Sequence, residues 1–137
     1  MKKATMWCAL AAATMVTGSG CRTTAGIRVE SYPITKIVVN SKALASYLQV
    51  AKVDKVERSG LWEAQITVES RKRKDFYVMY MFRWLREDGI QVTSGLSSWA
   101  PVKIRARDME MIKAMAPSPE AQHFICDIKF LDSSRSP

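Results

Sequence analysis

The chain holds few of the side chains that enzymes use for catalysis. It has one histidine, His123, and three cysteines, at positions 8, 21 and 126. A single imidazole cannot build a multi-histidine zinc site, and the cysteines are too far apart for a Cys-x-x-Cys pair. Neither a Gly-x-Ser-x-Gly nucleophile elbow nor a phosphate-binding P-loop is present. The sequence therefore predicts no metal and no cofactor.

Carboxylates are the remaining acid–base groups. The five that we considered fall at outward or turn positions of the predicted strands, where water solvates a carboxylate and no pocket surrounds it: Glu63, Glu69, Glu87, Asp88 and Asp127. We therefore expect a protein that is not an enzyme. A hydrolase with an unrecognised site is the alternative that this pattern leaves open.

A run of four basic residues is the most conspicuous charged feature. It joins two predicted strands and consists of Arg71, Lys72, Arg73 and Lys74. One interpretation is a solvated loop whose charges discourage edge-to-edge pairing of sheets. The other is a patch that binds an anionic partner and is extended by three further residues, Lys103, Arg105 and Arg107.

The N-terminus has the pattern of an export signal. Lys2 and Lys3 precede an apolar run over residues 6–16, and small polar residues follow at positions 17–20. The apolar run has barely half of the ~20 residues that a membrane-spanning helix needs. We expect residues 1–20 to be a removable signal peptide. Its removal takes away two lysines and so lowers the formal net charge of +8 by two.

Cys21 follows the small residues directly. Ser19, Gly20 and Cys21 resemble the bacterial lipobox, in which the cysteine thiol receives diacylglycerol, although Gly18 stands where that pattern usually has an aliphatic residue. Stable anchoring requires more than one acyl chain, and a triacylated cysteine meets that requirement. Arg22 rather than Asp after the cysteine favours the outer membrane. A plain secretory signal followed by an incidental cysteine is the alternative.

Cys126 would then be the one thiol of the mature domain. It shares a predicted strand face with Phe124, Ile128 and Phe130, whereas His123 lies on the opposite face. A catalytic thiol needs a base beside it, so this arrangement predicts a buried core cysteine.

Apolar and polar residues alternate along most of the chain, which is typical of strands. The alternation is clearest over residues 62–69, 75–87, 102–106 and 123–130, and the composition is that of an ordinary globular protein, 47% hydrophobic and 25% charged. Seven or eight strands in about 110 residues predict an all-β, Ig-like antiparallel β-sandwich. We expect a lipidated cysteine and tether over residues 21–26, the sandwich over 27–131 and a disordered tail over 132–137.

Two local features are open to more than one interpretation. Residues 44–51 and 108–115 have some helical spacing, and we expect both to be mostly extended because their neighbours are strands. Asp88-Gly89 is a residue pair typical of a type I′ hairpin turn, in which both central residues have positive φ. Ser59-Gly60 separates two further strands.

The long aromatic strand carries a family resemblance. Tyr80, Phe82, Trp84 and Gly89 resemble the Tyr-x-Phe-x-Trp-x-x-x-x-Gly core of the YcfL-like family of small bacterial envelope lipoproteins, a domain of unknown function, and the similarity extends from about Ile37 to Phe130. Arg86 departs from the Asp that is common there. The resemblance implies an Ig-like β-sandwich on an envelope lipoprotein. From the residues alone, such a stripe predicts core packing, with a carbohydrate-stacking face as the alternative.

These observations together predict a periplasm-facing outer-membrane lipoprotein with an accessory role. We expect it to bind another envelope component, either a protein or peptidoglycan, or anionic lipid head groups, and no nucleic acid. A glycan- or lipid-binding sandwich is the alternative, and it requires a cavity between the sheets.

Overall fold

The computed structural model describes residues 26–92 and 98–131. The predicted signal peptide, Cys21 and the C-terminal tail over 132–137 lie outside these residues. The described part contains eight strands and one short helix.

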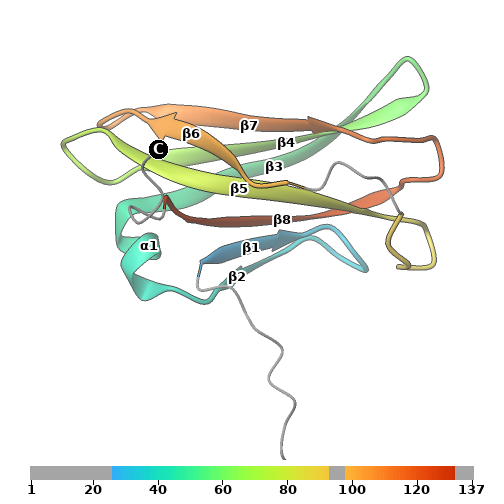
Figure 1. Ribbon diagram of the computed structural model, residues 1–137, viewed down its shortest axis with the longest axis horizontal. Helices are drawn as coiled ribbons and strands as arrows, with labels where there is room; N and C mark the ends of the chain where they lie inside the picture. Colours follow the sequence, from blue (N-terminus) through green and yellow to red (C-terminus); the bar gives the residue numbers. More distant parts are fainter. Residues whose placement is uncertain (1–25, 93–97, 132–137) are drawn as a thin grey trace, which may run out of the picture.

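Two antiparallel sheets pack face to face and form a sandwich (Figure 1). The five-stranded sheet has the order β2-β1-β8-β5-β6, with β2 at Lys36–Val39, β1 at Ile27–Glu30, β8 at His123–Phe130, β5 at Phe76–Leu85 and β6 at Ala100–Ile104. The three-stranded sheet has the order β3-β4-β7, with β3 at Leu48–Arg58, β4 at Leu61–Ser70 and β7 at Met109–Met115. The predicted antiparallel sandwich is confirmed, as is the extended conformation of residues 109–115.

The core lies between the sheets and is built from the alternating apolar residues of both. Ala64, Ile66 and Val68 of β4 are fully buried, as the alternation over residues 62–69 predicts. On β5, Phe82 and Trp84 pack against Phe124 of β8 with ring centroids 5.8 Å apart. The aromatic stripe is therefore core packing, which is the structural interpretation of the family motif.

A short helix, α1 at Lys42–Tyr47, corrects the expectation that residues 44–51 are mostly extended: residues 44–47 are helical, and the strand begins at Leu48. The Ser41 hydroxyl caps it by accepting a hydrogen bond from the Leu44 amide at 3.2 Å. One helical turn places both Leu44 and Leu48 in the core, where each is at most 1% exposed. The strand then runs on with a bulge between Val50 and Lys52. Burial of two leucines four residues apart therefore favours one helical turn, and the β-branched residues that follow form the strand.

The type I′ geometry that the sequence predicts at Asp88-Gly89 occurs instead at Ser59-Gly60. Ser59 and Gly60 both have positive φ, +52° and +80°, so the two-residue turn with type I′ geometry joins β3 to β4. At Asp88-Gly89 only Gly89 has positive φ, and the Gly89 amide donates to the Arg86 carbonyl at 2.9 Å. The expected type I′ turn at this place is therefore wrong.

The connection at Asp88-Gly89 is one residue longer than a two-residue turn, and this length sets the register of the hairpin. The Val92 amide donates to the Trp84 carbonyl, so Val92 lies opposite Trp84 and is 8% exposed. A two-residue turn at Asp88-Gly89 would shift the pairing by one residue and move Val92 to the other face. Burial of Val92 therefore explains the longer turn.

Candidate functional site

The two basic segments of the sequence lie side by side at one end of the sandwich, on the left in Figure 1. The loop between β4 and β5 contacts the connection between β6 and β7: the Arg107 amide donates to the Lys72 carbonyl at 3.0 Å, and the Ala106 amide donates to Asp75 Oδ1 at 2.9 Å. We call this region the basic end and define it by seven residues, Arg71, Lys72, Arg73, Lys74, Lys103, Arg105 and Arg107.

Few acidic groups oppose these seven charges. Asp75 and Asp108 are the carboxylates of the two segments, and Asp75 lies 3.3 Å from Lys103 Nζ. The Ala106 amide, and next to it Lys103, hold the pKa of Asp75 below its usual range. Among the residues that the structure describes, no ion pair involves Arg71 to Lys74, Arg105 or Arg107. The basic end thus presents a large positive excess to solvent.

Two of the basic side chains are fixed by neighbours at the end of α1 and the start of β3. The Arg71 guanidinium donates to Gln49 Oε1 at 2.5 Å, and Lys72 Nζ lies 4.4 Å from the centroid of the Tyr47 ring. The Tyr47 ring in turn makes edge contacts with Phe76 and Phe130. Packing against the core therefore holds the base of the loop, while Arg73 and Lys74 remain exposed.

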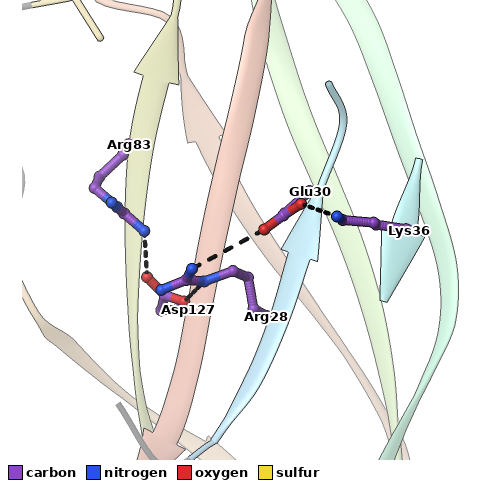
Figure 2. Close-up of polar contacts among 5 residues, drawn as sticks. All are labelled: Arg28, Glu30, Lys36, Arg83 and Asp127. Atoms are coloured by element: carbon purple, nitrogen blue, oxygen red, sulfur yellow. Dashed lines mark hydrogen bonds and ion pairs between the residues drawn. The ribbon is translucent and has the colours of Figure 1, made fainter. Parts of the chain in front are cut away.

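A second polar cluster crosses the face of the five-stranded sheet that is turned away from the core (Figure 2). Asp127 of β8 accepts from Arg28 Nε at 2.7 Å and from Arg83 at 2.9 Å. Arg28 also lies 4.0 Å from Glu30, and Glu30 pairs with Lys36 at 3.0 Å. The cluster links β5, β8, β1 and β2 through charged groups.

Asp127 corrects the expectation that the carboxylates are simply solvated. Its side chain is 8% exposed because Arg28 and Arg83 cover it. Both oxygens are engaged by guanidinium groups, so this carboxylate is a structural counter-ion for two half-buried arginines.

The other carboxylates lie near the surface with local partners. Glu63 accepts from Gln65 at 2.6 Å, which holds the pKa of Glu63 below its usual range, and Glu69 accepts from Gln49 at 2.8 Å. Asp88 pairs with Arg86 at 3.1 Å. Within residues 26–92 and 98–131, no three His, Cys, Asp or Glu side chains gather in a way that could hold a metal ion.

Cys126 and His123 are on opposite faces of β8, as predicted. Cys126 is completely buried, and burial, with a smaller effect of Asp127, raises the pKa of its thiol far above the usual range. His123 packs against the Tyr32 ring at 5.0 Å. Burial, and next the charge of Lys55, lower the pKa of His123. The expected core role of Cys126 is confirmed.

The described surface includes a narrow groove and a more open hollow. A groove of about 220 Å³ separates β2 from α1 and β3, with Ile37 and Val39 on one side, Leu48 on the other and Arg71 among its lining residues. It is smaller than the ~300–1,000 Å³ of most ligand pockets. A more open hollow of about 390 Å³ is lined by Arg86, Glu87, Asp88, Glu120 and Gln122 at the opposite end. In the described chain no helix has the length and apolar character needed to cross a membrane.

Comparison with known families identifies the domain. Residues 35–130 match the family described as "Protein of unknown function (DUF1425)". The chain belongs to the DUF1425 family. No curated protein matches the sequence.

Two solved structures share the fold of this DUF1425 domain. One is a DUF1425 family member from Shewanella sp. pv-4, with 20% sequence identity and a TM-score of 0.58 over 81% of this chain and 94% of that chain. The other is cj0090 of Campylobacter jejuni, with 24% identity and a TM-score of 0.54 over 60% of this chain and 85% of that chain.

The site that the sequence indicated and the site that the structure shows overlap in part. The structure brings the four contiguous basic residues and the three further ones together at one end. The sequence did not predict the cluster of ion pairs around Asp127. Arg28 is 99 residues from Asp127 along the chain, and Arg83 is 44 residues from it. The order of the strands in the sheet brings these side chains into contact. Cys21 lies outside the described residues.

Proposed function

We propose that this DUF1425 protein is an accessory lipoprotein of the bacterial envelope, of the YcfL-like kind. It is not an enzyme. In this proposal Cys21 carries the acyl chains, the domain faces the periplasm from the outer membrane, and the basic end binds an anionic component of the envelope. The observation that carries the proposal is the gathering of seven basic side chains, from two segments, at one end of the sandwich.

The remaining structure supports a binding role better than a catalytic one. Asp127 is saturated by two arginines, and Cys126 is a deeply buried thiol. The aromatic stripe of β5 is used for core packing, so the sheets enclose side chains at the place where a glycan would have to bind. These features favour an exposed charged surface as the functional one.

The anchoring part of the proposal is tested by cell fractionation. A Cys21→Ala variant is expected to leave the outer-membrane fraction, and its wild-type counterpart should yield an N-terminal peptide with the mass of an acylated cysteine. A variant that fractionates like the wild type would refute the lipid anchor.

The binding part is tested by crosslinking in cells, followed by mass spectrometry. We compare a variant with Arg71, Lys72, Arg73 and Lys74 all changed to Gln with a control that changes Lys36, Lys52, Arg58 and Lys113 to Gln. Both lose four positive charges, and all of these side chains are exposed except the half-buried Lys72. The proposal expects crosslinks of the wild type to be lost in the first variant and kept in the control. Equal loss in both would show that net charge, not the basic end, is responsible.

A further inference from the structure

The described chain enters the domain at the basic end. Residue Ile27, the first of β1, pairs with Ile128 near the end of β8, and the Asn40 amide at the end of β2 donates to the Gly26 carbonyl at 2.7 Å. In Figure 1 the beginning of β1 lies toward the same end as α1 and the β4–β5 loop. The turns after β3 and β5 are at the opposite end.

The chain between the proposed anchor and the domain is short. Six residue steps separate Cys21 from Ile27, so even a fully extended chain spans at most about 20 Å. Strand β3 has 11 residues and is about 35 Å long. An anchor at Cys21 therefore keeps the basic end close to the lipid head groups.

The charge distribution matches this placement. The turns at the opposite end carry an acidic excess, because Glu57, Glu87, Asp88 and Glu120 outnumber Arg58 and Arg86 there. An anionic surface attracts basic side chains only within about a Debye length, roughly 10 Å at 0.1 M salt. The short tether brings the basic end into that range, and the acidic turns point away.

Apolar side chains next to the basic end distinguish a lipid surface from peptidoglycan or an acidic protein. Ile37 and Val39 face the groove beside Arg71 and are 46% and 50% exposed. Strand β2 is at the edge of the described five-stranded sheet, and the groove separates these side chains from Leu48 on β3. Exposed aliphatic groups beside cations are the combination that binds at a membrane interface.

We infer that the basic end rests on the anionic phospholipid surface into which the acyl chains of Cys21 insert, so that the long axis of the sandwich points away from the membrane. This inference rests on the proposed lipid anchor. It names the phospholipid head groups as the anionic component, and makes peptidoglycan or an acidic protein an alternative outcome of the test.

The test uses the processed, acylated protein in vesicles of phosphatidylcholine alone or mixed with phosphatidylglycerol. Amine-reactive labelling is followed by peptide mass spectrometry at Lys74 and Lys103, with Lys52 and Lys113 as internal controls on the other sheet. We expect labelling of Lys74 and Lys103 to slow several-fold in the anionic vesicles at low salt and to recover at high salt. The control lysines should label equally in both vesicles.

The outcomes separate this inference from the proposed function. An acylated Cys21 with equal labelling of Lys74 in both vesicles overturns the inference and leaves the anchor intact. Protection of Lys74 by purified peptidoglycan or in a protein complex, but not by anionic vesicles, overturns it in favour of that partner. An N-terminal peptide without acyl mass refutes the proposed anchor itself. Changing residues 71–74 to Gln should abolish the protection of Lys103, whereas the four-residue control variant should keep it.

Discussion

Asp127 shows how one residue changes its meaning when the strand pairing is known. In sequence it is an alternating polar residue of a strand, with the pattern of a solvated carboxylate. In the sheet, Arg28 stands opposite it on β1 and Arg83 reaches it from β5. Two half-buried guanidinium groups therefore share this carboxylate, so the residue contributes to stability and both of its oxygens are engaged.

Removal of this carboxylate should destabilise the fold. We expect Asp127→Ala to lower the free energy of unfolding by about 2–3 kcal/mol, because Arg28 and Arg83 lose charge-assisted hydrogen bonds and repel each other. Asp54→Ala is the control, since Asp54 pairs with the exposed Lys52 and such pairs contribute about 0–1 kcal/mol. Urea denaturation measures both. Equal losses in the two variants would contradict the structural role of Asp127.

His123 predicts a pH dependence of stability. Burial and Lys55 hold its pKa below 6.5, so the unfolded chain binds a proton more readily than the folded one. Stability from this residue is fully present above pH 6.5 and is lost as the pH falls through the lowered pKa of the folded state. We expect His123→Gln to flatten the decline in unfolding free energy between pH 6.5 and pH 4.5, above the range in which Glu63 titrates. Denaturant titrations across this range measure it, and identical slopes in variant and wild type would contradict it.

At the scale of elements, turns and helix ends decide where strands begin, and the sequence predicts these less well than the strands. Strand β8 has the predicted bounds, and its buried residues Phe124, Cys126 and Ile128 have the period of two that predicted it. Helix α1 was missed because a six-residue helix is too short to show a helical period against a strand. The turn at Asp88-Gly89 has a typical type I′ sequence, but the burial of Val92 requires the longer connection.

The type I′ turn at Ser59-Gly60 predicts that two substitutions of Ser59 change the free energy of unfolding in opposite directions. Ser59 has φ +52°, a conformation that Asn tolerates and β-branched residues do not. We expect Ser59→Asn to raise the free energy of unfolding by about 0.5 kcal/mol and Ser59→Val to lower it by about 1–2 kcal/mol. Thermal or urea unfolding measures both variants. Shifts in the same direction would show that the turn does not have this geometry.

The described part of the molecule has two unequal layers, five strands against three, and its candidate site lies where loops of both layers share one end. The basic run was visible in the sequence because its four residues are contiguous. Its convergence with Lys103, Arg105 and Arg107 was a hypothesis, since it depends on which loops share an end. The exposure of Ile37 and Val39 was not predictable, because it follows from the edge position of β2 and from the groove between β2 and β3.

The position of each strand within the five-stranded sheet predicts how stability is distributed across the molecule. Strand β8 pairs with β1 and β5 on both sides, and Phe124, Cys126 and Ile128 are at most 1% exposed, so its amides should exchange with solvent only when the whole domain unfolds. Strand β2 has four residues, pairs on one side and is largely exposed, so local opening should suffice there. We expect hydrogen–deuterium exchange in β2 to be at least about tenfold faster than in β8.

Strand β6, at the other edge of the same sheet, is the matched control, because the completely buried Ile104 should slow its exchange relative to β2. If β2 and β8 exchanged at the same rate, the groove beside β2 would have to be covered in solution, which would remove the apolar part of the proposed membrane contact.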